Sequence, residues 1–275
     1  DHRDLHSFPT RRSSDLIAAS ARAKEMSDID IEDKGIMASV FGDCATVQRV
    51  LDSVDGYVIA ANINGPKQTV IGGESVAVEK ALAKFKEMGI ESVRLPVSHA
   101  FHTRIVAPAA PRLRKMLDQM EIGSPRIPII SNVTGTWYPT EGNVKPKVLD
   151  LLQQQIMSPV QFIQGVETLY RDGARIFLEV GPKKALSGLV GEILGSRPHL
   201  SAFCIHPKKE EMSSFNEVLA LFYAQGIGTM ATQESPTRVK SLEQAEKNYP
   251  LSDREEKEPV EEIHNITGED RKSVV

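Results

Sequence analysis

The chain has 275 residues, of which 40% are hydrophobic and 25% are charged, and its formal net charge is −4. This is the composition of an ordinary globular protein, and the length suits one large domain or two smaller ones. The charge balance, the single Trp and the five Tyr argue against a nucleic-acid-binding surface. No apolar run approaches the roughly 20 residues that a membrane span needs, so we expect no membrane contact.

The chain contains two cysteines, Cys44 and Cys204, which lie far apart in the sequence. They predict neither a disulfide framework nor a thiolate metal site, and we expect buried free thiols in the reducing cytoplasm. His99 and His102 form a His-x-x-His pair, but no further Cys, His or carboxylate cluster accompanies it. We therefore predict no metal site.

The two ends of the chain do not resemble natural protein sequence. Residues 1–16 have neither a helical nor a strand period and no secretory signal. Back-translated, they resemble a sequencing-adapter oligonucleotide, and residues 270–275 fit the reverse complement of the same adapter. We expect both ends to be artefacts of cloning or assembly and the natural protein to continue upstream of Ile17; natural disordered termini are the alternative.

A compact series of elements is predicted after a helix at Ile17–Met26 and an acidic loop. The series comprises strands at Gly35–Phe41, Tyr57–Asn62, Gln68–Ile71 and Ser92–Val97, and helices at Ala45–Ser53 and Glu74–Met88. The order strand–helix–strand–strand–helix–strand is that of a ferredoxin-like subdomain, residues 35–97.

Strands and helices continue to alternate after this series. We predict strands at Arg126–Asn132, Arg175–Val180 and Leu200–Ile205, and helices at Ala107–Met120, Val144–Ile156, Val160–Arg171, Ala185–Leu194 and Ser213–Ala224. Such alternation favours an α/β fold with a parallel sheet covered on both faces. Residues 226–269 are polar, charged and non-periodic, and are predicted to be a linker.

The stretch from Leu95 to Thr103 lies between a predicted strand and a predicted helix. A histidine on such a bend can face a cleft and act as a general base for a nucleophile. Two surface or capping histidines are the alternative, and spacing alone does not decide between the two.

Five short motifs carry a family resemblance. They are Asn62–Gly73 (NINGPKQTVIGG), His99–His102 (HAFH), Ser131–Gly135 (SNVTG), Ser158–Phe162 (SPVQF) and Leu178–Pro182 (LEVGP). With these motifs in the family's order, the chain resembles, from Ile17 to about Gln225, the acyltransferases that load malonyl groups onto acyl carrier protein. It looks most like the acyltransferase domains of polyketide or polyunsaturated-fatty-acid synthases. The resemblance implies an α/β-hydrolase-like large subdomain, residues 17–34 and 98–225, incomplete here, with the ferredoxin-like subdomain inserted.

The resemblance also implies the roles of individual residues. In the family a Ser in a Gly-His-Ser-x-Gly elbow attacks the thioester, and the position of its histidine base matches His102. The backbone carbonyl that orients this ring matches Gln155, for which a solvated helix position is the alternative. The arginine that binds the malonyl carboxylate matches Arg22, although Ala23 stands where the family prefers Gly. A guanidinium suits that task because its planar fork pairs with both carboxylate oxygens. For Arg22, a surface arginine on a helix is the alternative.

Selectivity is expected to depend on the His-Ala-Phe-His motif. In the family this form accompanies malonyl, whereas Tyr-Ala-Ser-His accompanies methylmalonyl. By this resemblance Phe101, His99 and Ser98 contact the substrate, and the Phe101 ring leaves no room for an extra methyl group. One methyl is worth only about 1–3 kcal/mol, so a preference for malonyl is expected rather than strict selection.

The printed sequence contains no Gly-x-Ser-x-Gly and no Gly-Gln-Gly. The resemblance therefore implies a parent enzyme that moves malonyl from malonyl-CoA, through the missing Ser, to the phosphopantetheine thiol of acyl carrier protein. The chain by itself is expected to be inactive and to bind no further cofactor. Acyl carrier protein is the expected partner, and flanking synthase domains in the same polypeptide are a further expected partner. The competing interpretation is a non-catalytic ferredoxin-like ligand-binding module.

Overall fold

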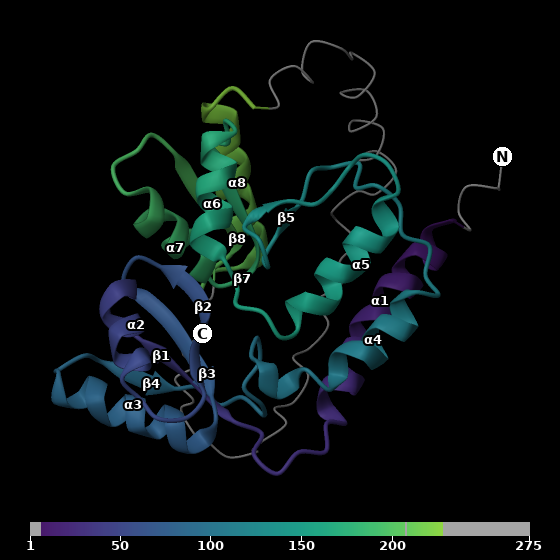
Figure 1. The fold of residues 1–275 in the computed structure, drawn as a ribbon. Coiled ribbons are helices and arrows are strands. Elements are labelled where there is room, and N and C mark those ends of the chain that lie inside the picture. The colour runs from purple at the N-terminus through teal and green to yellow at the C-terminus, as the bar shows by residue number, and fades with distance from the viewer. Residues whose placement is uncertain (1–6, 207, 228–275) are drawn as a thin grey trace, which may run out of the picture. The chain divides into compact units, whose positions relative to one another are not determined.

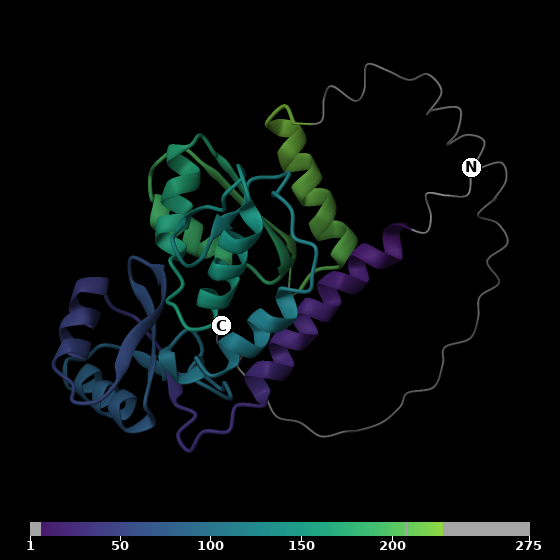
Figure 2. The same ribbon diagram turned by 45° about the vertical axis from the view of Figure 1, so that its right-hand side comes forward.

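The computed structural model describes residues 7–206 and 208–227 (Figures 1 and 2). The chain divides into two compact units, Asp1–Glu179 with Ala185–Ser201, and Val180–Lys184 with Ala202–Val275. All the candidate site residues belong to the first unit. Residues 228–269 of the linker predicted at 226–269, and the predicted artefact at residues 270–275, lie outside the described residues.

A four-stranded sheet with two helices forms one part of the first unit (Figure 1). In chain order its elements are β1 (Ile36–Val40), α2 (Cys44–Asp52), β2 (Val58–Gly65), β3 (Gln68–Gly73), α3 (Ser75–Glu87) and β4 (Ser92–Arg94). The strands lie in the order β2-β3-β1-β4, and each neighbouring pair is antiparallel. The element order predicted for residues 35–97 is therefore confirmed.

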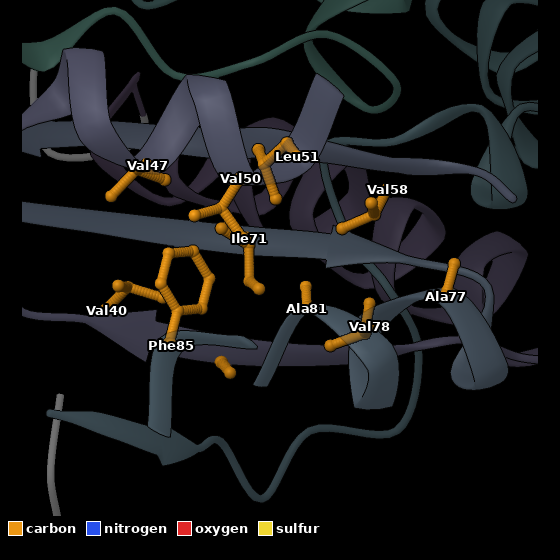
Figure 3. Packing of buried hydrophobic residues seen from close by; sticks show 11 residues of the cluster. Val40, Val47, Val50, Leu51, Val58, Ile71, Ala77, Val78, Ala81 and Phe85 are labelled. Atoms are coloured by element: carbon orange, nitrogen blue, oxygen red, sulfur yellow. The ribbon is translucent and has the colours of Figure 1, made fainter. Parts of the chain in front are cut away.

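The core of this part lies between the helices and the sheet. Apolar residues recur at helical spacing on α2 and α3, so each helix presents one apolar stripe. Figure 3 shows Phe85 of α3 beside Val40 of β1 and Ile71 of β3, and all three side chains are fully buried. The Asp43 side chain accepts a hydrogen bond from the Thr46 backbone N–H at 2.8 Å and thereby caps the start of α2.

Three helices pack together elsewhere in the first unit: α1 (Ser7–Ser27), α4 (Ala109–Leu117) and α5 (Val144–Gln155). Helix α1 lies beside α4 in both views (Figures 1 and 2). The buried side chains that join them include Met26, Leu113 and Leu149. A short 3-10 helix, η1 (Arg104–Val106), precedes α4.

Helix α1 begins earlier than the sequence predicts. Residues 1–16 show no helical period, but the helix already begins at Ser7. Adding residues to an existing helix costs far less than nucleating one, so the Ala-rich segment from Ile17 can extend toward the N-terminus. Pro9 stands in the first turn, where a missing backbone N–H is tolerated.

The predicted buried strand at Arg126–Asn132 is wrong for most of its length. Only Ile130–Ser131 form a strand, β5, which pairs antiparallel with β6 (Thr136–Trp137). Ile127 and Ile129 are 78% and 52% exposed. Their apolar pattern suggests a central strand, but no strand pairs with residues 126–129 within the described part of the chain. Without a neighbouring strand the backbone has no ladder to join.

The remaining predicted elements are confirmed with small shifts of their ends. They are α6 (Phe162–Arg171), β7 (Ile176–Pro182), α7 (Ala185–Leu194), β8 (Leu200–Ile205) and α8 (Glu211–Ala224). β7 and β8 form a two-stranded sheet, and the boundary between the two units crosses both strands. The fold is α/β.

In the described part of the chain no helix is long and apolar enough to cross a membrane. Both cysteines are half-buried free thiols.

Candidate active site

Hydrogen bonds hold the loop from Ser98 to Thr103 in place. The Ala100 backbone N–H donates a hydrogen bond to the Lys34 carbonyl at 2.9 Å. The buried Thr103 hydroxyl donates to the Ala100 carbonyl at 2.6 Å, and it also accepts from the Ile105 backbone N–H, which caps the start of η1. These bonds form a tight bend with His102 at its end.

His102 has a left-handed backbone conformation, with φ of 59°. This region is uncommon for a residue other than glycine, and it persists where the surroundings hold it. The His102 backbone N–H donates to the Ile156 carbonyl at 3.0 Å. The ring Nδ1 lies 2.9 Å from the Gln155 carbonyl oxygen. Backbone and ring are thus both attached to the C-terminal end of α5.

The contact with Gln155 determines the tautomer of the His102 ring. A backbone carbonyl only accepts hydrogen bonds, so Nδ1 carries the proton in this contact. In the neutral ring Nε2 then bears a free lone pair. This arrangement can accept a proton at Nε2, as a general base must.

Burial is the main influence on the pKa of His102. Burial lowers this pKa because it disfavours the charged ring, and the positive charge of Arg22 lowers it further. Backbone hydrogen bonds to Gln155 and Ser158 raise the pKa of His102 without reversing the net lowering. The lowered pKa favours the neutral ring, which is the form that can accept a proton.

Arg22 lies on α1, one helical turn before the buried Met26. Its side chain is exposed and makes no hydrogen bond or ion pair with another described residue. The guanidinium is close enough to act electrostatically on His102, but no direct contact joins them. The structure thus brings His102 and the Gln155 carbonyl together, and leaves Arg22 as a cation without a partner among the described residues.

His99 and Phe101 form the inner side of the loop. His99 is only 2% exposed, and its ring centroid lies 6.0 Å from that of Phe101. The His99 Nδ1 lies 3.0 Å from the hydroxyl of the exposed Ser98, whereas Nε2 is buried without a partner among the described residues. Burial lowers the pKa of His99, and the charge of Lys34 adds to this effect. Phe101 packs against two apolar clusters, one of which includes α1 and α4 residues.

Two contributions to the site were missed by reasoning from the sequence. The Ile156 carbonyl holds the backbone of His102, and the Ser158 backbone acts on its ring. Both are main-chain groups, which residue type does not reveal. The only sequence signal was the motif Ser158–Phe162, whose Val160 pairs with Asn62 of β2 in an isolated parallel bridge.

Comparison with known proteins identifies the family of this chain. Residues 14–218 match the sequence model described as "Acyl transferase domain". The chain belongs to the acyl transferase domain family. It is 36% identical, over 165 residues, to a malonyl CoA-acyl carrier protein transacylase of Bacillus subtilis, covering 58% of this chain and 51% of that protein. The chain therefore spans about half the length of this relative.

Two further relatives show the range of the acyl transferase domain. A polyunsaturated fatty acid synthase protein of Thraustochytrium is 30% identical over 195 residues, which are 70% of this chain and 7% of that protein. The crystal structure of a malonyl CoA-acyl carrier protein transacylase from Clostridium perfringens superposes with a TM-score of 0.68 at 31% identity, covering 77% of this chain and 64% of that one.

The family match bears on the competing interpretation of a ligand-binding module. That interpretation accounts for residues 35–97 only, whereas the matched acyl transferase domain runs from residue 14 to residue 218.

Within the described residues no group of three or more His, Cys, Asp or Glu side chains could hold a metal ion.

Proposed function

We propose that this acyl transferase domain serves in the transfer of a malonyl group from malonyl-CoA to the phosphopantetheine thiol of acyl carrier protein. The observation that carries the proposal is the contact between the His102 Nδ1 and the Gln155 carbonyl at 2.9 Å. It fixes the tautomer that a base for a hydroxyl nucleophile needs. The family match supports the substrate class, because the Bacillus subtilis relative is a malonyl CoA-acyl carrier protein transacylase.

The proposed reaction has two steps, acylation of the serine and transfer of the malonyl group to the carrier thiol. His102 Nε2 takes the proton of a serine hydroxyl while the serine oxygen attacks the thioester carbonyl of malonyl-CoA. The tetrahedral adduct collapses, the C–S bond breaks, and the imidazolium returns its proton to the CoA thiolate. In the second step His102 takes the proton of the phosphopantetheine thiol, whose sulfur attacks the malonyl ester, and the serine leaves with that proton. The backbone contact of His102 with Ser158 favours the imidazolium between these steps.

The serine nucleophile is the component that this chain does not supply. The printed sequence contains no Gly-x-Ser-x-Gly, the motif in which the family carries it. We infer that a separate segment has to complete the site and that the chain alone transfers no malonyl group. A place within a larger synthase, as in the Thraustochytrium relative, suits this requirement. We also propose the cytoplasm as the compartment in which the protein works.

Arg22 is proposed to bind the free carboxylate of the malonyl group. Its guanidinium is exposed and unpaired within the described residues, and its charge is felt at His102. A bidentate pair with a carboxylate would anchor the acyl group beside the base. An Arg22→Gln change in a completed enzyme is expected to remove the preference for malonyl-CoA over acetyl-CoA. An unchanged preference would exclude this role.

Phe101, with His99 and Ser98, is proposed to set the size of the acyl pocket. The Phe101 ring is wedged between two apolar clusters, so it cannot move aside easily to admit an extra methyl group. A completed enzyme offered malonyl-CoA and methylmalonyl-CoA together is expected to favour malonyl about 10- to 100-fold. Equal use of both thioesters would contradict this assignment.

The test of the overall function is complementation. A segment that carries the Ser elbow, taken from the Bacillus subtilis relative, is fused upstream of Ile17 in this chain. Incubation with malonyl-CoA and acyl carrier protein is expected to give malonyl-carrier protein, whereas the chain alone gives none. A fusion that folds but never forms a malonyl-enzyme would overturn the proposal.

A further inference from the structure

The loop that carries His102 is attached to the residue that immediately precedes strand β2. Arg104, two positions after His102, donates its backbone N–H to the Tyr57 hydroxyl at 2.9 Å. The Arg104 guanidinium also lies over the Tyr57 ring, 3.8 Å from its centroid. Tyr57 is held in turn by Glu74: its backbone N–H donates to the Glu74 carboxylate at 3.1 Å, and its carbonyl accepts from the Glu74 N–H at 2.8 Å.

The segment that carries the orienting carbonyls is attached to strand β2 itself. Val160 follows Gln155 by five positions, and its backbone N–H donates to the Ala61 carbonyl at 2.9 Å. The Val160 carbonyl accepts from the Ile63 N–H at 2.9 Å, which completes a parallel bridge at the free edge of β2. Pro159 stiffens the link between this bridge and the end of α5.

We propose that strand β2 is the template that holds His102 and the Gln155 carbonyl in register, with Tyr57 as a positioning residue for the His102 ring. The ring and the carbonyl come from segments far apart in the sequence. The first is bonded within a few residues to Tyr57, which immediately precedes β2, and the second to β2 itself. The catalytic meaning of this template rests on the proposed function. The geometric role of β2 and Tyr57 can be tested whether or not the domain transfers malonyl groups.

The disfavoured backbone of His102 explains why such a template is needed. A non-glycine residue with φ of 59° tends to relax to a more populated region unless neighbouring bonds prevent it. The bond from Arg104 to Tyr57 fixes the chain just after His102, as the bond from Ala100 to Lys34 fixes it just before. Loss of the Tyr57 hydroxyl should therefore loosen the His102 ring without removing any apolar contact.

Three variants of the present chain isolate this hydrogen bond. Tyr57→Phe removes the acceptor and keeps the ring under Arg104. Arg104→Pro removes the donor, and the site accepts proline because Thr103 before it has φ of −130° and ψ of 167° and because Arg104 opens η1. Arg104→Ala is the matched control, since it deletes the guanidinium but keeps the backbone N–H. Tyr223→Phe, at an exposed tyrosine of α8, controls for the loss of a hydroxyl as such.

The readout is the ¹⁵N and ¹H NMR spectrum of the His102 imidazole, assigned by its loss in His102→Gln. We expect the Nδ1–H proton to exchange with solvent about two- to tenfold faster in Tyr57→Phe and Arg104→Pro, with the Nδ1–H tautomer less populated. The double variant should show no further change, because both substitutions delete one bond. Arg104→Ala and Tyr223→Phe should match the parent.

Two results would overturn the proposal. One is an unchanged His102 spectrum in both Tyr57→Phe and Arg104→Pro; the other is exchange of the Val160 and Ile63 amides at the rate of unprotected peptide. Neither measurement uses malonyl-CoA, so a failure of the template is distinguishable from a failure of the acyl transfer.

Discussion

The ring Nδ1 of His102 lies 2.9 Å from the carbonyl oxygen of Gln155, across 53 positions of sequence. The same helix end holds the His102 backbone through the Ile156 carbonyl. Because a carbonyl can only accept, this contact orients the ring and selects its tautomer together. The role of base that we propose for His102 rests on this relationship.

Arg22 should keep the pKa of His102 low in the free protein. After burial, which is the largest influence, the charge of Arg22 disfavours the protonated ring. We therefore expect Arg22→Gln to raise the pKa of His102 in an NMR titration. Lys24→Gln, which removes a like charge from the same helix, should leave it unchanged. A pKa of His102 that is the same in Arg22→Gln as in the parent would show that Arg22 lies too far away to act.

The lowered pKa of His102 also predicts how stability and activity depend on pH. The pKa of His102 in the folded protein lies below its ordinary value of 6.5. The neutral ring therefore contributes its stability fully above pH 6.5, and this contribution is lost as the pH falls through the folded-state pKa. In a completed enzyme kcat/KM should stay level down to a pH below 6.5 and then decline. A decline that begins well above pH 6.5 would indicate a charged ring instead.

Asp33 should stabilise the start of α3 from a distance of 42 positions in sequence. Its carboxylate accepts from the Ser75 hydroxyl at 2.6 Å, from the Ser75 backbone N–H at 2.8 Å and from the Gly35 N–H at 2.8 Å. The hydrogen bonds from Ser75 lower the pKa of Asp33 below 3.8. The stabilisation is thus present above pH 3.8 and lost as the pH falls through the folded-state pKa.

The corresponding variant is Asp33→Ala. We expect the free energy of unfolding to fall by about 0.5–1 kcal/mol at pH 7, the lower range for a cap because the site is exposed. The difference from the parent should shrink as the pH drops below 3.8 in urea titrations. Asp30→Ala, in the same loop, is the control and should cost little. Equal losses in the two variants would contradict the capping role.

Amide hydrogen exchange should reveal uneven stability within the first unit. β1 and β3 are central strands over a buried core, so their amides should exchange slowest. Residues 126–129 pair with no strand in the described part of the chain and expose Ile127 and Ile129, so they should exchange fast. Equally slow exchange in both regions would contradict this expectation.

The sequence sufficed for elements whose neighbours are close along the chain. The stripe Val78, Leu82 and Phe85 predicted α3, and Pro96 explains why the predicted strand Ser92–Val97 ends as β4 at Arg94, since proline donates no ladder bond. The apolar run at Arg126–Asn132 gave a wrong strand prediction, because such a segment forms a strand only where a partner strand is present. Periodicity reflects one segment alone and contains no information about which segments lie next to it.

The candidate site was less accessible to such reasoning. His102 and Gln155 were paired only through the family resemblance, since on its own pattern Gln155 is one more polar residue near the end of a helix. Its role uses the backbone oxygen, and any side chain would serve equally in that respect. The left-handed backbone of His102 and the bond from Arg104 to Tyr57 likewise leave no trace in residue type. These features arise from tertiary contacts.

The most direct measurement is the rate at which a completed enzyme acquires a malonyl group, followed by intact-protein mass spectrometry. His102→Gln should slow this acylation about 10²- to 10⁴-fold, the usual contribution of a general base. The matched control is His199→Gln, at another half-buried histidine whose Nδ1 lies 2.7 Å from a backbone carbonyl, that of Arg197; its rate should equal that of the parent. Acylation of His102→Gln at the parental rate would contradict the assignment of His102 as the base.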